Sequence, residues 1–453
     1  MSATLRRNVL REARAVRARI AWDPEQMEQF RLSRARHILL QAATCVPYYR
    51  ERFQQWRFNP RKFTSFDDLR ALPCLTRDDL RDFGETLRDE QRDPGTLVRM
   101  STGGTTGTPV SVYLDPRAGV ERMLVNHRMY SMMGRRLGDS TLLIAGSPID
   151  VQAWSTFRER VKSRLFGVTV RSSFKLTPDC IQRTLRDISV GRFQWVIAYA
   201  SVFDILAAGV TEAYRKPSRL RIISCAELVT EAQRERWREC LGAEVFEIYG
   251  AREMSSIAGE VRDHEALVVN ADLYHIEITD TDGRVLPQGV PGLITITTLH
   301  ESAMPLIRYQ LGDVGMLVPT TGVDMYPVPR LKITHGRILD VICCPDGKLL
   351  PGEFFPHLMK EVQREVRQFQ VVQTALNRLE VRIMPHGSFR DDTRQYLEAH
   401  IHEQTGHQME VQVVLVDGIE HSASGKYRPT ISVVPLEAKQ FSQSVGASAS
   451  SAR

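Results

Sequence analysis

A run of glycine and hydroxyl residues, Ser101–Pro109, has the composition of a phosphate-binding loop. It reads Ser-Thr-Gly-Gly-Thr-Thr-Gly-Thr-Pro, with three glycines, five hydroxyl side chains and no charge. Glycine allows turns with positive φ and close approach of a ligand to the backbone, and successive amides in such turns form anion-binding concavities. A Walker loop is excluded, because Gly107 is followed by Thr108 instead of lysine. The run predicts polyphosphate binding, with an ordinary polar loop as the alternative.

Four later motifs each place a reactive or ligand-binding side chain beside a glycine. Taken singly, each has an ordinary structural explanation: Asp313 could be a turn residue, Arg337 a surface ion-pair partner and Lys426 a flexible loop lysine. Their order along the chain is the stronger signal. The motifs are Tyr249-Gly250-Ala251-Arg252-Glu253, Tyr309-Gln310-Leu311-Gly312-Asp313, Gly336-Arg337-Ile338-Leu339-Asp340 and Ser424-Gly425-Lys426-Tyr427-Arg428.

Strand-like and helix-like segments alternate through the middle of the chain. One helix is expected to start at Thr177-Pro178, with Thr177 as its N-cap and Pro178 in its first turn, and another to run from Thr230 to Leu241 with Gly242 as its terminator. Such alternation implies a mostly parallel sheet with helices on its faces, and ligands then bind at the carboxyl ends of the strands. The expected strands are Thr141–Ala145, Trp195–Tyr199, Leu220–Ser224 and Glu244–Tyr249.

The flanking regions have different patterns. Residues 1–97 look helical, with a helix over Met27–Gln41 and a helix cap at Thr76, whereas Val46–Arg50 reads as a loop on its own. Residues 267–335 are β-rich and contain an Asp282-Gly283 hairpin turn. A small final unit is expected to include helices over Glu353–Glu365 and Asp391–Gln404, followed from residue 437 by a disordered tail rich in Ser, Ala and Gln.

In this order and at these separations, the motifs resemble the adenylate-forming superfamily of acyl-CoA ligases. The resemblance is to its phenylacetate–CoA ligase and CapK-like capsular-polysaccharide branch, which also matches Val46–Arg50 and Leu72–Thr76 and covers roughly residues 30–435. It implies an α/β fold: a large N-terminal domain (1–336) with mostly parallel sheets flanked by helices plus a β-rich subdomain, and a small, mobile α+β C-terminal domain (337–436).

The resemblance also implies the chemistry and its residues. A carboxylate attacks the α-phosphorus of ATP to form an acyl-adenylate, and a thiol, usually that of CoA, then displaces AMP. Glu253 would hold Mg²⁺, Tyr249 would stack on adenine beside Gly250, and Lys426 would neutralise charge at the α-phosphate. Asp313 and Arg337 would bind the ribose. The β- and γ-phosphates would be held by Ser101, Thr102, Gly103, Gly104, Thr105, Thr106 and Gly107.

The substrate-facing positions depart from the family pattern. Arg252 replaces the family's threonine and could meet an acidic group or point to solvent. Leu339 replaces the usual Asp or Lys of the hinge. The acyl pocket would include Tyr199, Ala226, Glu227, Ala251 and Arg252, and an aromatic or hydrophobic acid is the default substrate. We expect no zinc, because no cysteine lies between Cys240 and Cys343.

Composition limits the class of protein and its surroundings. A net charge of +6 over 453 residues argues against nucleic-acid binding. No run approaches a membrane span. The seven cysteines form no C-x-x-C pair and are expected to be reduced, buried and structural in a cytoplasmic protein. The arginine-rich stretch from Met1 to Ile20 could lie on an anionic membrane surface, but a solvated helix is favoured. The sequence is compatible with a homodimer.

The sequence is compatible with three functions. The first is an acid–CoA ligase. The second adenylates an acid but delivers it to a carrier-protein thiol or an amine. The third is a catalytically weak binding component of surface-polysaccharide or secondary-metabolite synthesis. Retention of Glu253, Asp313 and Lys426 together favours an enzyme, because a decayed site has no reason to keep all three residue types.

Overall fold

A computed structural model of the chain divides into two compact units. Unit one comprises Met1–Thr102, Val110–Gly134 and Ile248–Gly336, and unit two comprises the remainder. Strand β7 (Ala243–Ala251) begins in unit two and ends in unit one. The structure describes residues 3–102, 110–145, 167–173, 176–251, 253–261, 266–319, 328–335, 341–352, 354–359, 361–362, 364–419 and 428–434.

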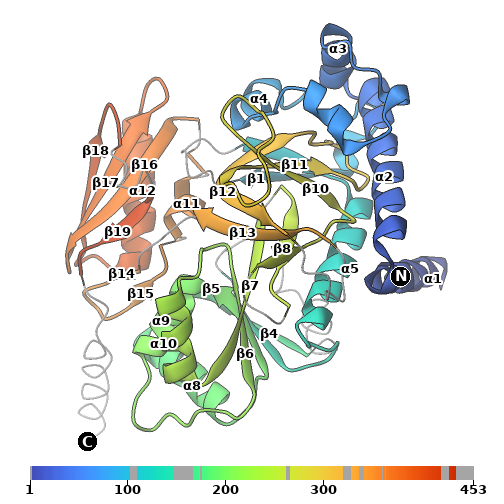
Figure 1. Ribbon diagram of the computed structural model, residues 1–453. Helices are drawn as coiled ribbons and strands as arrows, with labels where there is room; N and C mark the ends of the chain where they lie inside the picture. The colour runs from blue at the N-terminus through green and yellow to red at the C-terminus, as the bar shows by residue number, and fades with distance from the viewer. Residues whose placement is uncertain are drawn as a thin grey trace, which may run out of the picture. The chain divides into compact units, whose positions relative to one another are not determined.

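Unit one combines the N-terminal helices with an antiparallel sheet (Figure 1). The sheet order is β10-β11-β12-β13-β9-β8, and β8 then pairs with the last residues of β7. This confirms the predicted β-rich part. The helices are α1 (Ala3–Ala18), η1 (Arg19–Ala21), α2 (Pro24–Cys45), α3 (Pro47–Gln55), η2 (Pro60–Lys62), η3 (Phe66–Ala71), α4 (Arg77–Phe83), η4 (Pro94–Thr96) and α5 (Pro116–Met132). The strands are β1 (Val98–Thr102), β2 (Val110–Leu114), β8 (Ser255–Gly259), β9 (Leu267–Val269), β10 (Tyr274–Thr279), β11 (Gly292–Thr298), β12 (Tyr309–Val318) and β13 (Arg330–His335).

The loop expected over Val46–Arg50 is wrong, because helix α3 begins there at Pro47. Proline is well suited to the first position of a helix, where its missing N–H has no intrahelical acceptor. The two aromatics then become core residues: Tyr48 is 8% exposed and Tyr49 2%. A proline between two apolar residues therefore marked the start of a helix and not a break in the chain.

The arginine-rich N-terminal stretch only partly matches the expected solvated helix. Arg11, Arg14 and Arg17 are exposed along α1, as a solvated helix requires. Arg19, however, is 5% exposed and donates to Asp272 at 2.8 Å and to Glu121 at 3.2 Å. A guanidinium is buried readily when carboxylates compensate its charge, so this arginine anchors the N-terminal helices to the body of unit one.

Unit two begins with a parallel sheet whose strand order is β6-β5-β3-β4. This confirms the mostly parallel α/β pattern. The expected caps are present, since Thr177 and Thr230 each accept a backbone N–H, and Gly242 ends its helix with φ 69°. The elements are β3 (Thr141–Ala145), β4 (Val168–Ser172), α8 (Pro178–Ser189), β5 (Trp195–Tyr199), α9 (Ala200–Ala208), β6 (Leu220–Cys225) and α10 (Glu231–Leu241).

The C-terminal part of unit two is a four-stranded sheet in the order β18-β17-β16-β19. Its apolar side chains form one cluster with the helices, including Phe369, Val381 and Leu397. The helix expected over Glu353–Glu365 is shorter, because its described part covers only Phe354–Met359. The elements are β14 (Ile342–Cys343), β15 (Leu349–Leu350), α11 (Phe354–Met359), β16 (Val366–Ala375), β17 (Arg378–Pro385), α12 (Asp391–Thr405), β18 (Glu410–Leu415) and β19 (Thr430–Ser432).

The cysteines and the surface give two further observations. None of the seven cysteines forms a disulfide, but only Cys343 and Cys344 are buried, so burial of all seven was a wrong expectation.

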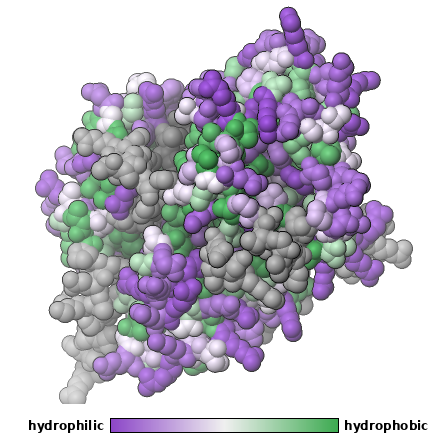
Figure 2. Space-filling model, viewed as in Figure 1, coloured by the Kyte–Doolittle hydropathy of each residue, from purple (hydrophilic) through white to green (hydrophobic). Residues whose placement is uncertain are grey.

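In the view of Figure 2, hydrophobic residues lie in small groups among hydrophilic ones. No helix in the described ranges is long and apolar enough to cross a membrane.

Candidate active site

The end of β7 and the middle of β12 bring two predicted nucleotide-binding side chains together. The hydroxyl of Tyr249 donates a hydrogen bond of 2.8 Å to the Asp313 carboxylate, although the residues lie 64 positions apart. Gly312 precedes Asp313 with φ 88°, a conformation that favours glycine. The pair combines an aromatic ring with a carboxylate, which are suitable partners for a purine and for ribose hydroxyls.

Glu253 lies in the same unit and is 7% exposed. Its Oε1 accepts a long hydrogen bond of 3.4 Å from the Tyr309 hydroxyl, and the Arg77 guanidinium lies 3.7 Å away. Burial, together with the Glu253 charge, raises the pKa of Tyr309, so this hydroxyl remains a proton donor. Both contacts are longer than an ideal charged hydrogen bond, and the carboxylate is therefore only loosely engaged.

This donor set fits a magnesium ion. Mg²⁺ prefers hard oxygen ligands and usually takes one or two carboxylates, with waters and substrate phosphates completing its shell. Glu253 supplies one such carboxylate. Arg77 supplies positive charge beside it, which also suits a bound polyphosphate.

Gly250 separates Tyr249 from Ala251 at a close approach of β7 to β8. A Cβ built on Gly250 would lie 2.3 Å from the carbonyl oxygen of Ser255, which is backbone and cannot rotate away. Ser255 itself has φ 71°. Glycine at this position is therefore a packing requirement of the hairpin that carries Tyr249 and Glu253.

Replacing Gly250 with alanine should consequently destabilise unit one by about 1–3 kcal/mol, the usual range for overpacking a rigid site. Urea unfolding of Gly250→Ala measures this. The matched control is Gly119→Ala on α5, where a Cβ would meet nothing within 4 Å and alanine favours the helix. Equal stability of Gly250→Ala and the unchanged protein would contradict the steric argument.

The predicted phosphate loop is described only at its ends. Ser101 and Thr102 close strand β1, and Thr102 faces Val110 at the start of β2 in an antiparallel pair. The two strands therefore hold both ends of the loop at facing positions. The remaining loop residues, Gly103, Gly104, Thr105, Thr106 and Gly107, lie outside the described residues, as do Arg252, Arg337, Leu339 and Lys426.

The predicted acyl-pocket residues fall in both units. Ala251 is at the end of β7 in unit one, whereas Tyr199, Ala226 and Glu227 follow β5 and β6 in unit two. Glu227 is 6% exposed and accepts from the backbone N–H of Ser201 at 2.6 Å and from its hydroxyl at 2.8 Å. Its carboxylate thus caps the first turn of α9.

Three side chains in these contacts were not predicted from the sequence. Arg77 and Tyr309 flank Glu253, and Ser201 holds Glu227. Arg77 directly follows the Leu72–Thr76 signature, and Tyr309 opens a motif that had been noted only for Asp313. The sequence therefore showed that Arg77 and Tyr309 lie beside or within these motifs, but it did not show that both contact Glu253.

Comparison with known proteins gives matches over most of the chain. A family model described as AMP-binding enzyme matches residues 16–300, and one described as CapK C-terminal domain matches residues 342–433. The chain is 26% identical over 337 residues to a phenylacetate-coenzyme A ligase of Aromatoleum evansii, which covers 73% of this chain and 74% of the relative. Identity to the phenylacetate-coenzyme A ligase of Pseudomonas putida is 26% over 343 residues, covering 74% and 76% respectively.

Solved structures give the fold. A 2-hydroxyisobutyryl-CoA ligase in complex with 2-HIB-AMP and CoA has a TM-score of 0.63 at 18% identity, covering 95% of this chain and 94% of that one. At this identity the likeness shows a shared fold alone.

Proposed function

Because the chain belongs to the AMP-binding enzyme family, we propose that it activates a carboxylic acid with ATP as an acyl-adenylate and transfers the acyl group to the thiol of CoA. Adenylate-forming acyl-CoA ligase activity is what its relatives support. The observation that carries the proposal for this chain is the Tyr249–Asp313 pair, in the same unit as the buried carboxylate of Glu253.

The described residues of the candidate site have the following roles in the proposed reaction. Tyr249 stacks on adenine, and Asp313 accepts from the ribose hydroxyls while holding the Tyr249 hydroxyl. Glu253 holds Mg²⁺, which would neutralise phosphate charge when bound. Arg77 adds positive charge beside Glu253, and Tyr309 orients that carboxylate through its hydroxyl.

Most of the remaining nucleotide-binding roles belong to residues outside the described ranges. The loop from Ser101 to Gly107 cradles the β- and γ-phosphates, Arg337 supports the ribose, and Lys426 reaches the α-phosphate. We assign Lys426 to a C-terminal lid of residues 337–436 that swings between an adenylation pose and a thioester-forming pose. The default substrate is an aromatic or hydrophobic acid, whose pocket includes Tyr199 and Ala226.

The decisive experiment is acid-dependent exchange of pyrophosphate into ATP over a panel of aryl and aliphatic acids. Exchange with at least one acid is expected, and supplying CoA should then give a thioester detectable by mass spectrometry. Exchange without formation of a CoA thioester would indicate that the acyl acceptor is a carrier-protein thiol or an amine. Absence of exchange with every acid would favour a binding component of surface-polymer or secondary-metabolite synthesis.

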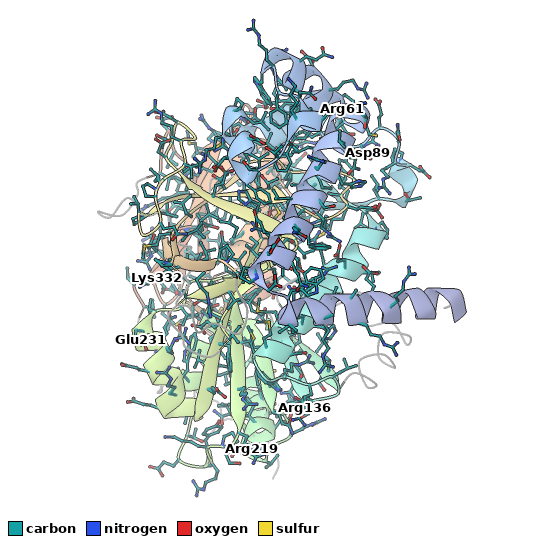
Figure 3. The ribbon with its side chains drawn as sticks, turned by 45° about the vertical axis from the view of Figure 1, so that its right-hand side comes forward. Arg61, Asp89, Arg136, Arg219, Glu231 and Lys332 are labelled. Atoms are coloured by element: carbon teal, nitrogen blue, oxygen red, sulfur yellow. The ribbon has the colours of Figure 1, made fainter. Side chains whose placement is uncertain are left out.

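Replacing Glu253 with glutamine should raise the Mg²⁺ concentration needed for half-maximal exchange by roughly 10- to 100-fold, because the amide keeps the shape but removes the charged ligand. Titration of exchange against Mg²⁺ measures the shift. Glu231→Gln is the matched control, since Glu231 is an exposed helix residue (Figure 3). An unchanged Mg²⁺ requirement in Glu253→Gln would remove Glu253 from the metal site.

A further inference from the structure

Two sequence signatures that adenylation does not use meet around one cavity in unit one. Helix α3, which begins inside Val46–Arg50, supplies Tyr48 and Arg52, and the Leu72–Thr76 signature supplies Leu72 and Cys74. The cavity measures about 170 Å³ and is also lined by Trp56 and Asp79. Every lining residue belongs to unit one and to the described part of the chain.

The cavity has the size and walls of a site for a single aromatic ring. An apolar protein cavity of about 150 Å³ is known to accept benzene. Tyr48, Tyr49 and Trp56 provide aromatic walls, and Leu72 is 2% exposed. The Tyr49 hydroxyl is already satisfied, because it donates to the Pro305 carbonyl at 3.1 Å and accepts from the Ile307 N–H at 3.2 Å. Tyr49 therefore offers its ring and not a polar group.

Two charged side chains line the cavity, and they are compensated to different degrees. Asp79 caps helix α4, where its Oδ2 accepts from the Thr76 N–H at 2.8 Å and from the Thr76 hydroxyl at 2.6 Å. A carboxylate in the first turn of a helix is further stabilised by the helix dipole. Among the described residues, the contacts of Arg52 are with neutral groups: it donates to the Gln55 amide oxygen at 2.8 Å and lies over the rings of Tyr48 and Phe83. The cation is thus the less compensated charge.

We propose that this cavity binds a small aryl carboxylate, with the ring between Tyr48 and Trp56 and the carboxylate on Arg52. A planar guanidinium is the side chain best suited to a carboxylate, which it can bind through two parallel hydrogen bonds. The site is separate from the residues assigned to adenylation, and binding of a ligand there does not depend on the proposed reaction.

The cavity wall is hydrogen-bonded to the strand that carries the candidate active site. The Leu75 N–H donates to the Arg308 carbonyl at 2.9 Å, and the Gln310 N–H donates to the Leu75 carbonyl at 2.9 Å. Leu75 thereby pairs with Tyr309, whose hydroxyl contacts Glu253. A ligand against Leu72 and Cys74 would contact the segment that holds this strand.

Cys74 provides a nearby reporter, because this residue is partly exposed and belongs to the cavity lining. The experiment follows alkylation of each cysteine by peptide mass spectrometry, at alkaline pH and without ATP, in the full-length protein. Phenylacetate or benzoate should slow alkylation of Cys74, whereas acetate, which lacks a ring, should not. Cys180 and Cys240, which are partly exposed in unit two, are the internal references and should keep their rates.

Charge variants test the carboxylate assignment in both directions. Arg52→Gln should raise the phenylacetate concentration for half-protection of Cys74 by about tenfold or more, the effect of losing a charged hydrogen bond. Asp79→Asn keeps an oxygen for the helix cap but removes the negative charge, and should lower that concentration. The matched control is Arg61→Gln, an exposed arginine in the same helical region (Figure 3), which should change neither value.

The same measurements can overturn the proposal. Absence of Cys74 protection by both aryl acids would remove the site. Protection by benzylamine in place of phenylacetate, with the opposite response to Arg52→Gln and Asp79→Asn, would assign it to an aryl cation. Protection that slows every cysteine equally would show a general effect on folding. Failure of acid-dependent ATP exchange would leave the Cys74 result standing, so the two proposals fail separately.

Discussion

Replacing Lys426 with alanine is expected to lower acid-dependent ATP–pyrophosphate exchange by about a hundredfold or more. A preorganised charge aimed at the reacting group commonly contributes a rate factor of this size. Thioester formation from supplied acyl-adenylate and CoA should remain largely intact, because in the proposed two-pose lid the second step does not use Lys426. The two half-reactions are measured separately, by exchange and by mass spectrometry of the thioester.

The control for this variant is Lys332→Ala, which removes an exposed lysine from β13 (Figure 3). It should leave both half-reactions unchanged. Equal losses of adenylation and thioester formation in Lys426→Ala would contradict a lid with two poses. Full exchange activity in Lys426→Ala would remove the lysine from the reaction.

Replacing Asp272 with asparagine is expected to reduce the free energy of unfolding by about 3–5 kcal/mol, the range for breaking a buried ion pair. Asp272 is fully buried and accepts from both terminal nitrogens of Arg128 at 2.7 Å and from Arg19 at 2.8 Å. The substitution would leave two buried guanidinium groups undercompensated. Urea unfolding monitored by circular dichroism measures the loss.

The same cluster predicts the pH dependence of stability. Burial alone would raise the pKa of Asp272, but the charges and hydrogen bonds of Arg128 and Arg19 overcome it and hold the pKa well below its usual value. The stabilisation is therefore complete above the unfolded-state pKa of about 3.9, and it is lost as the pH falls towards the lower folded-state pKa. Asp272→Asn should flatten this acid limb of the stability curve.

The surface pair of Asp67 with Arg70 supplies the control, since both side chains are more than half exposed. Asp67→Asn should change stability little, because exposed ion pairs contribute little. A similar acid limb in Asp272→Asn and in the unchanged protein would show that other carboxylates set the acid response.

Features that depend on neighbouring residues could be predicted from the sequence alone. Thr177, Thr230 and Gly242 act within one helical turn, so their caps and terminator could be predicted, and the alternation from Thr141 to Tyr249 predicted parallel strands. The order of the motifs indicated the family. Prediction failed where one local pattern is compatible with two structures. Pro47 is an example, because a proline can interrupt regular structure or occupy the first position of a helix.

Contacts between side chains from different elements could be identified only in the folded chain. The contacts of Arg77 with Glu253, of Arg19 with Asp272 and of Ser201 with Glu227 join different elements, and each depends on strand register and helix placement. A shift of one residue in register turns a strand side chain to the opposite face, so spacing along the chain cannot specify such partners. For this reason the residue types of the proposed nucleotide site could be named from the sequence, whereas the contact of Arg77 with Glu253 could not.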